Sequence, residues 1–565
     1  MPADILGRSL RNFCFLALTI VAGSLVVCGA DWPMQGGNPQ HNGWAKGEDL
    51  VTKANVGGLK VLYKYRADNA SIGLNSLTSP IIDGNLITYL GFKEMLIFGA
   101  SSDKIFSVDA DLNKLIWESR LPDRADKPRS GTAELGCPGG LMTPVSMAGS
   151  SSSFINFAAV ARRIPAVPGA PRIRPSPYLP PLWESVYPMR PDTLTRLAAL
   201  YTVSRDGNLH VLNSSTGEDL IPSIRFVPPN SKVTSLSFRD NVVYATTGDN
   251  CNGYQNALFA IDLLSPEKTV TSFVPQGGGF SGTGGAAIGK DGTIYVQVLY
   301  APGDTVGHYH ETTIALTPKE LKVKDYFTPG GKPIDRKSSE APGITPIVSS
   351  WMGKEIVLTG SRNGRLYLLD STSLGGVDHH TPLFASAVLA QTNKNYDGDG
   401  FRGTFSSWLD VDSDTRWFYA PVPGRTDSSV GSKTGGIIAL KLTAQNGQPE
   451  LQQVWVSQEI FSPAPVVIAN GMLFVLSTGE SPRLANKNGR PYTLAELQQL
   501  AKPAILYALD AVTGKELYSS GNAVSSASDS GGLAVANGRV YFTTNDNSVY
   551  CFGLPQGQLQ LTEQR

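Results

Sequence analysis

Two histidine pairs and one glycine-rich run are the patterns whose residue types and spacing alone could support chemistry. His308 and His310 alternate along a predicted strand or loop, and His379 is followed directly by His380, so either pair could place two imidazoles on one metal ion. A protein metal site needs a third ligand, which the sequence does not locate for either pair, and we therefore expect solvated imidazoles. The run 277–285 does not lead from a strand into a helix, as a phosphate-binding loop would, so we interpret it as the entry to a sheet.

The cysteines set a second limit on the chemistry. Cys137, Cys251 and Cys551 follow the N-terminal apolar stretch, and none belongs to a CxxCH haem-attachment motif or a CxxC zinc pair. We therefore expect no haem. A disulfide between Cys137 and Cys251, in neighbouring structural units, is one interpretation, and three buried thiols is the other. The sequence does not choose between them.

A repeated strand pattern must position these residues. Period-two alternation of apolar residues, which predicts half-buried β-strands, recurs in eight short runs that each end in a polar turn. They cover residues 105–109, 209–213, 258–262, 313–317, 366–370, 437–441, 506–510 and 549–553. Successive runs end 104, 49, 55, 53, 71, 69 and 43 residues apart. A recurring unit of roughly 40–50 residues with several strands is typical of a propeller blade, and the larger gaps are then loop insertions.

The clearest unit predicts four antiparallel strands joined by tight turns, the first of them at Asn470-Gly471. The last unit, which starts near Gly532, has only three strands before the chain nearly ends. Residues 59–66 have the pattern of a fourth strand, and nothing before them completes a blade. We therefore predict an all-β fold: an eight-bladed β-propeller of four-stranded antiparallel blades, closed by pairing of the N- and C-terminal strands.

Composition fits a single secreted domain over residues 31–565, and we expect a monomer. The chain has 48 Lys and Arg against 48 Asp and Glu, and no basic run is long enough to follow a nucleic-acid backbone. We therefore exclude nucleic acid as a partner. A small molecule or a protein bound at the channel face is the partner that the propeller prediction favours.

Residues 1–30 have the pattern of a secretory signal peptide. Arg8 and Arg11 precede an apolar stretch at 13–27, and small residues lead to Ala30. This predicts cleavage after Ala30 and a periplasmic or extracellular protein.

Two alternatives for this leader stay open. A lipoprotein would be anchored through Cys28, but Val27 is bulky where such a signal prefers a small residue. A retained membrane anchor is also conceivable, although the apolar stretch is short for a span. No other segment of the sequence could cross a bilayer, so we predict no transmembrane segment in the mature chain.

Two insertions interrupt the repeat. The Pro- and Arg-rich stretch 161–191 carries nine prolines, which forbid both helix and ladder pairing, so we predict an extended rim loop that is either solvated or a docking arm for an acidic partner. The insertion 485–502 predicts one short helix over 494–500, with Thr493 as its cap.

Motifs at the start of the mature region and in the repeats carry a family resemblance. The opening Asp-Trp-Pro-Met-Gln-Gly-Gly-Asn at 31–38, and the stretch LYALDAVTGKELY at 506–518, are similar to those of the pyrroloquinoline-quinone (PQQ) dehydrogenases. The latter stretch resembles their repeat, in which Ala, Asp, Thr-Gly and an aromatic residue lock neighbouring blades. Strings such as 364–376 and 408–424 resemble those of secreted bacterial PQQ-repeat propellers, a group related to these enzymes. These motifs are specific for a fold rather than for a chemistry.

The resemblance implies a PQQ and calcium site at the mouth of the central channel. Glu340, three residues before Gly343, falls where the family has its catalytic Asp, and Asp335 is a second candidate for that base. A carboxylate there could abstract an alcohol proton and also ligate calcium. Because Glu is one methylene longer than Asp, its oxygen would be displaced by about an ångström.

The same resemblance assigns further cofactor contacts. Arg362 occupies the place of the family's quinone-contacting cation, where a guanidinium could stabilise negative charge, and Asn363 follows it. Asp249 occupies the place of an Asn calcium ligand and Asn250 adjoins it. For each of these residues, a loop or turn role is the alternative.

Several family features are missing. Where the family has a Trp that forms the floor under the quinone, this chain has Phe238, which would serve only if its ring turned toward the channel. No two cysteines are adjacent, so the family's cysteine lid is absent. The calcium-binding Glu should follow the second strand of the second blade, where only Asp206 stands; Glu134 matches the motif superficially but precedes that blade.

These observations leave two hypotheses from different classes. In the first, the chain is a secreted binding or scaffold propeller with a degenerate quinoprotein site. In the second, it is a PQQ- and calcium-dependent dehydrogenase that oxidises an alcohol or sugar. The missing floor and lid favour the first, and the polar residues kept at Glu340, Asp249 and Arg362 sustain the second.

Overall fold

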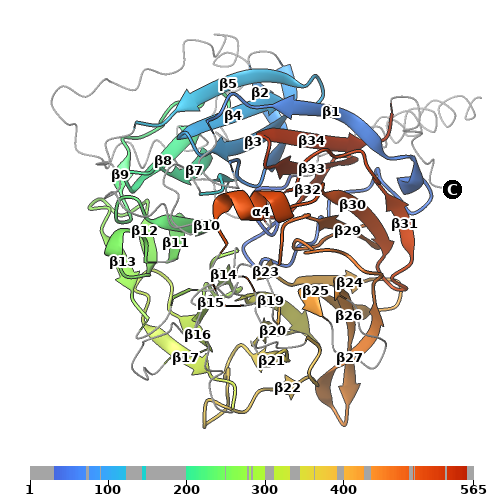
Figure 1. Ribbon diagram of the computed structural model, residues 1–565. Coiled ribbons are helices and arrows are strands. Elements are labelled where there is room, and N and C mark those ends of the chain that lie inside the picture. Colours follow the sequence, from blue (N-terminus) through green and yellow to red (C-terminus); the bar gives the residue numbers. More distant parts are fainter. Residues whose placement is uncertain are drawn as a thin grey trace, which may run out of the picture.

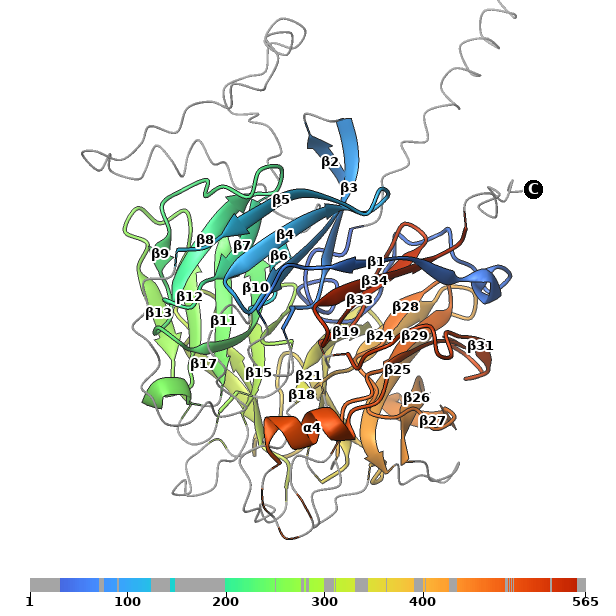
Figure 2. The ribbon, with the colours of Figure 1, turned by 45° about the horizontal axis from the view of Figure 1, so that its top comes forward.

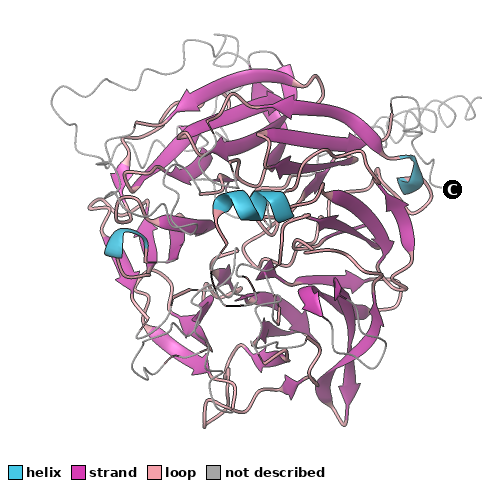
Figure 3. Ribbon diagram, in the orientation of Figure 1, coloured by secondary structure: helices cyan, strands magenta, loops and turns pink. Residues whose placement is uncertain are grey.

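The architecture is a closed ring of eight four-stranded antiparallel sheets, as the strand repeat predicts (Figure 1). This computed structural model describes residues 31–555 except 71–75, 89–90, 123–142, 148–198, 249, 276–278, 281–283, 299–308, 310, 331–343, 362, 391–399, 402, 426–433, 483–485, 487, 489, 491 and 529–530. The leader 1–30 and the stretch 161–191 lie outside the described residues, so both predictions stand as they were made. Figure 3 shows how little of the ring is helical.

Each blade runs from an innermost to an outermost strand, and four blades form the first half of the ring. Blade 1 is β2 (Ile81–Thr88), β3 (Gly91–Ala100), β4 (Lys104–Asp109) and β5 (Lys114–Arg120). Blade 2 is β6 (Ser146–Met147), β7 (Ala199–Val203), β8 (Asn208–Asn213) and β9 (Ile224–Arg225). Blade 3 is β10 (Lys232–Arg239), β11 (Val242–Gly248), β12 (Leu258–Asp262) and β13 (Val270–Phe273). Blade 4 is β14 (Ala287–Ile288), β15 (Ile294–Val298), β16 (Thr312–Leu316) and β17 (Val323–Phe327).

The second half of the ring follows the same order. Blade 5 is β19 (Ile347–Trp351), β20 (Lys354–Gly360), β21 (Leu366–Asp370) and β22 (Phe384–Ala385). Blade 6 is β24 (Ser406–Asp410), β25 (Thr415–Arg425), β26 (Thr434–Gln445) and β27 (Gln448–Val456). Blade 7 is β28 (Val467–Ala469), β29 (Met472–Ser477), β30 (Ile505–Asp510) and β31 (Glu516–Ser519). Blade 8 is β32 (Ala534–Ala536), β33 (Arg539–Thr544), β34 (Ser548–Gly553) and β1 (Lys60–Arg66).

A few short elements lie between the blades. A parallel pair joins β18 (Ile344–Thr345) to β23 (Gly403–Thr404), and single 3-10 turns span Val56–Gly58 and Cys251–Gly253. Helix α4 (Leu494–Leu500) lies within the 485–502 insertion, and its N-cap is Thr493, whose side chain accepts a hydrogen bond from the Glu496 amide. None of the helices within the described ranges is long and apolar enough to span a bilayer.

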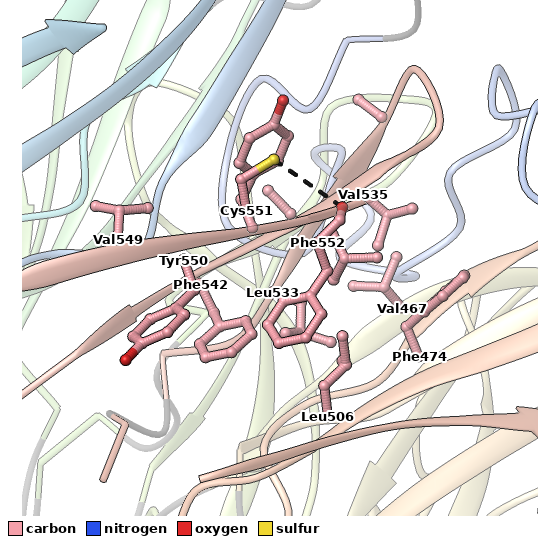
Figure 4. Packing of buried hydrophobic residues seen from close by; sticks show 14 of the residues in the cluster. Val467, Phe474, Leu506, Leu533, Val535, Phe542, Val549, Tyr550, Cys551 and Phe552 are labelled. Atoms are coloured by element: carbon pink, nitrogen blue, oxygen red, sulfur yellow. Dashed lines mark hydrogen bonds between the residues drawn. The ribbon is translucent and has the colours of Figure 1, made fainter. Parts of the chain in front are cut away.

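The ring closes through the two ends of the chain, which confirms the predicted closure. β1 pairs antiparallel with β34, from Lys60 opposite Gly553 to Arg66 opposite Ser548, and Figure 1 shows the two side by side. Behind this seam lies a core shared by blades 7, 8 and 1, in which the Phe542 ring stacks on Tyr550 at 5.8 Å and on Phe552 at 5.7 Å (Figure 4). Burial stabilises such a core by roughly 25 cal/mol per Å² of apolar surface.

Polar contacts fasten blade 8 to blade 1. The Arg539 guanidinium lies 3.0 Å from the Glu94 carboxylate and 2.6 Å from that of Asp111, and the Tyr541 hydroxyl donates to Glu94 at 3.2 Å. Burial raises the pKa of Glu94 to about 7, although the charge of Arg539 opposes that shift. The neighbouring Cys551 is a free, buried thiol whose pKa burial raises to about 12, so it is unreactive at neutral pH.

The channel axis is occupied by residues 32–45, which we call the axial segment. Its backbone carbonyls at Pro33, Pro39, Gln40, Asn42 and Gly43 accept hydrogen bonds from the innermost strands of blades 2, 4, 5, 6 and 7, at 2.7 to 3.1 Å. The Trp32 amide donates to Ile82 of blade 1 at 2.9 Å, the Gln35 side-chain amide donates to Gly531 beside blade 8 at 2.8 Å, and His41 Nε2 lies 3.3 Å from the Ser237 hydroxyl of blade 3. One short stretch of chain therefore contacts all eight blades.

Local sequence explains this compact path. Gly36 and Gly37 both adopt positive φ, at 77° and 79°, which non-glycine residues rarely tolerate. A Cβ on Gly37 would lie 2.7 Å from the Trp32 ring, so the indole packs directly on that glycine. The Asp-Trp-Pro-Met-Gln-Gly-Gly motif is thus a turn that fits inside the ring.

Adjacent blades are locked by aromatic rings on the outer strands. Trp117 of β5 donates from Nε1 to the Ser214 carbonyl of blade 2 at 2.8 Å, and Trp455 of β27 donates to the Ala511 carbonyl of blade 7 at 3.2 Å. Each ring packs on the glycine of a Thr-Gly turn, at Gly217 and Gly514 respectively. This is the lock between neighbouring blades that the repeat resemblance implies.

A matched pair of glycine substitutions tests this lock. A Cβ on Gly514, with φ at +72°, would lie 2.7 Å from the Trp455 ring, whereas one on Gly447, with φ at +76°, would meet nothing within 4 Å. Both alanine variants carry the backbone penalty of about 1 kcal/mol. We expect Gly514→Ala to lose about 2 kcal/mol more than Gly447→Ala in urea unfolding, because only it overpacks a ring. Equal losses would contradict the proposed contact.

Acid should weaken the axial segment through His41. Burial lowers the pKa of His41 from 6.5 to about 4, so between these values the unfolded chain binds a proton that the folded chain does not. Stability is therefore lost as pH falls through that window, by about 2.5 kcal/mol between pH 7.5 and 4.5.

His41→Asn removes this titration and keeps a residue type that tolerates the positive φ of 55°. We expect the unfolding free energy of the wild type to fall by about 2.5 kcal/mol more than that of the variant over this range. Parallel pH profiles for the two proteins would show that His41 does not control the acid sensitivity.

Candidate functional site

The described strands that flank the predicted site residues end on one face of the ring. Asp249 directly follows β11 and Arg362 follows β20, so both stand in connections between second and third strands; Asp335 and Glu340 stand between blades 4 and 5. Because strands alternate in direction in every blade, these two kinds of connection emerge on the same face, which we call the loop face. α4 lies on it too, at the bottom of Figure 2, opposite the projecting β2 and β3. These four side chains lie outside the described residues, so their roles remain predictions.

Asn250 forms its hydrogen bonds within its own loop. Its amide N–H donates to Asn256 Oδ1 at 2.9 Å, and its Oδ1 accepts from the Asn256 amide at 3.1 Å. The loop also bends through positive φ at Asn250 and Asn252, and Cys251 between them is disulfide-bonded. The partner thiol lies outside the described residues, so Cys137 as that partner stays a prediction. The geometry favours the turn role for Asn250 over a cofactor contact.

Asn363 is likewise engaged by its hairpin. Its Nδ2 donates to the Tyr367 hydroxyl at 2.8 Å, and its Oδ1 accepts from the Arg365 amide at 3.0 Å. Burial raises the pKa of Tyr367, which keeps that hydroxyl protonated. Since both ends of the Asn363 amide are used locally, it holds the turn that precedes β21.

Phe238 turns away from the channel. Its side chain is 3% exposed and belongs to the core between blades 2 and 3, where its ring stacks on Tyr201 with centroids 4.8 Å apart and planes 21° from parallel. The adjacent residue Ser237 points to the opposite face of the strand, toward blade 4, and its hydroxyl donates to the Ala286 carbonyl at 2.6 Å. The condition under which Phe238 could replace the missing Trp floor is therefore not met.

Asp206 serves a polar network that sequence reasoning missed. The Ser204 hydroxyl donates to Asp206, and its oxygen lies 3.0 Å from His210 Nε2. His210 Nδ1 lies 3.1 Å from both carboxylate oxygens of Asp219. Asp206 also accepts from the Asn208 side chain at 2.8 Å. No fixed motif joins these five residues, so no sequence pattern indicated the network.

The distances in this network match those of a Ser-His-Asp catalytic triad, but a substrate could not reach its serine and histidine. Ser204 is 3% exposed and His210 is 1% exposed. A hydroxyl has one proton, and that of Ser204 is directed to Asp206, whereas a serine nucleophile must give its proton to the histidine. We conclude that the network fixes the turn between β7 and β8.

A labelling experiment checks this conclusion. We expect Ser204→Ala to lower the unfolding free energy by about 1–2 kcal/mol, because His210 loses a buried partner. Ser272→Ala, which changes an exposed side chain of β13, should have little effect. We also expect no fluorophosphonate adduct on Ser204 by mass spectrometry in the wild type. A covalent adduct at Ser204 would instead identify a nucleophile.

The described histidines of the His379-His380 pair have structural partners. The His379 ring stacks on Tyr326 of blade 4 with centroids 4.0 Å apart, and its Nδ1 lies 3.0 Å from the Asp325 carboxylate. His380 Nδ1 lies 2.8 Å from the Thr328 carbonyl. His308 and His310 lie outside the described residues. Within the part of the chain that the structure describes, no three His, Cys, Asp or Glu side chains converge as a metal site would require.

Comparisons with known proteins agree with the fold. A scan against protein-family models finds no match, and a search of curated proteins finds none either. Among solved structures, the chain is similar to a europium-containing methanol dehydrogenase, with a TM-score of 0.55 and 12% identity over 93% of this chain and 98% of that one.

Two quinohaemoprotein enzymes are similar as well. The alcohol dehydrogenase of Comamonas testosteroni gives a TM-score of 0.52 at 12% identity over 93% of this chain and 80% of that one. The alcohol dehydrogenase ADHIIG of Pseudomonas putida HK5 gives 0.53 at 11% identity over 95% and 82%. These likenesses establish that the chain has the eight-bladed fold of the quinoprotein alcohol dehydrogenases.

The described residues do not fit the PQQ and calcium site that this fold implies. The ring at the floor position is packed between two blades, and the Oδ1 of Asn250 and the side-chain amide of Asn363 are held by their own turns. Asp206, which stands at the expected Glu position, is held by Ser204 and Asn208.

Proposed function

We propose that this protein is a secreted binding or scaffold propeller whose quinoprotein-type site has degenerated. The observation that carries the proposal is the placement of Phe238, whose ring stacks on Tyr201 within the core and leaves no aromatic floor at that position for a planar quinone. The turn roles of Asn250, Asn363 and Asp206 support it. Such a protein would work in the periplasm or outside the cell, as a monomer.

The fold itself suits this function. Ring closure and the axial segment hold the blades rigidly, while every blade contributes connections to the loop face. Binding residues in proteins are concentrated on loops that a rigid scaffold positions. A face built from many independent loops can accommodate a small molecule or a protein without any cofactor.

A cofactor titration tests the proposal against dehydrogenase activity. The mature protein is titrated with PQQ in the presence of calcium while cofactor fluorescence is followed, and dye-linked oxidation of alcohols and sugars is then assayed. We expect no saturable binding at micromolar PQQ and no oxidation, because a stacked quinone would lack its platform.

The control for this experiment is Arg362→Ala. Saturable binding in the wild type that this variant abolishes would favour the second candidate function, a PQQ-dependent dehydrogenase with Glu340 or Asp335 as base and Asp249 on calcium. Binding that the variant retains, without turnover, would show non-specific adsorption and leave the binding function standing.

A further inference from the structure

A groove on the outer side of the ring lies between blades 2 and 3. Its volume is about 360 Å³, within the range of ligand-binding clefts, and its lining is mainly apolar. Phe226 and Pro228, which follow β9, form one wall, and Phe259 of β12 and Val270 of β13 form the other. The Phe226 and Phe259 rings meet edge to face, with centroids 6.3 Å apart. The groove therefore lies between two blades, and its walls are formed by β12, β13 and the segment that follows β9.

Two side chains at the groove are left open to a ligand. Tyr254, in the disulfide-bonded loop after β11, is 41% exposed although it is aromatic. Arg225, at the end of β9, is exposed and lines the groove, and no carboxylate of the described residues forms an ion pair with its guanidinium. Apolar walls beside an unpaired cation are complementary to an apolar group that carries a nearby negative charge.

Among the described residues, the strands beside the groove have no partner on their outer edges. β13 is the outermost strand of its sheet, and Val270, its first residue, lines the groove. β9, the outermost strand of blade 2, is only two residues long. An outermost strand presents backbone N–H and C=O groups that can pair with an added extended chain. A segment paired with β13 could place alternate side chains in the groove.

We propose that this groove binds an extended peptide segment of a partner protein, in which an aliphatic or aromatic residue lies within two positions of a carboxylate. The apolar side chain packs on the exposed edges of Phe226 and Phe259, Tyr254 covers it, and the carboxylate pairs with Arg225. This proposal names a partner for the binding function proposed above, and it rests on that function. Because the groove lies away from the channel, a failure of the peptide-binding proposal would leave the result of the PQQ titration unchanged.

The probe for this proposal is a random heptapeptide library displayed on phage and selected on the immobilised mature protein. Enriched peptides are synthesised with a fluorescent label, and their affinities are measured by anisotropy. We expect enriched sequences that share an apolar residue next to Asp or Glu. Arg225→Gln and Tyr254→Ala should each weaken binding about tenfold, and Arg225→Lys should weaken it less because a lysine keeps the charge but loses the bidentate geometry.

Arg120→Gln is the matched control, since Arg120 is also an exposed arginine at the end of an outermost strand, β5 of blade 1. It should bind the selected peptides like the wild type, and all variants should keep the wild-type melting temperature because the substituted side chains are exposed. The proposal is overturned by the absence of enrichment, by peptides without a carboxylate, or by peptides that bind Arg225→Gln and Tyr254→Ala with unchanged affinity. It is also overturned if sedimentation shows a dimer that Arg225→Gln dissociates, since a second copy would then occupy the groove.

Discussion

The axial segment is the constraint on which the ring depends. In a propeller each blade contacts only its two neighbours, so small errors in the angle between blades would accumulate around the ring. Residues 32–45 prevent this, because one short stretch of chain is hydrogen-bonded to residues in or beside the innermost strands and fixes them relative to a common point. Buried backbone groups must be paired, and here the polar groups of the strands and of the segment satisfy one another. The inner strands can therefore be short, as β6 and β14 are.

The same constraint bears on function. A quinone site needs a planar aromatic floor that faces the channel, yet the inner strand of blade 3 turns its aromatic ring toward blade 2 and a serine toward blade 4. Polar residues at the blade ends also serve the turns of the ring, as the network around Ser204 illustrates. Packing between blades and hydrogen bonds within turns thus explain the presence of aromatic and polar residues that would otherwise suggest a catalytic or cofactor site.

Much of the fold could be predicted because its signals are local. Alternation in segments such as 366–370 marks the third strands, and Asn-Gly at 470–471 marks a hairpin. The axial segment could not be predicted, since it has no periodicity and its partners are backbone groups as far away as Gly531.

The candidate site was harder to predict for a related physical reason. Residues 235–238 of β10 are buried on both faces, so alternation no longer reveals which face meets the channel, and the direction of Phe238 could not be inferred. The network of Ser204 and His210 was missed because its residues come from a single strand, β8, and from the turns on either side of it. The groove between blades 2 and 3 depends on how blades pack, which strand patterns do not encode.

The seam between β1 and β34 fixes the order of events during synthesis. A ribosome makes β1 among the first strands and its partner among the last, so the edge of β1 waits unpaired until nearly the whole chain has emerged. Contacts of such long sequence separation form slowly. A chain interrupted before β34 would lack the partner of β1 and leave that strand edge unpaired and able to associate with other chains.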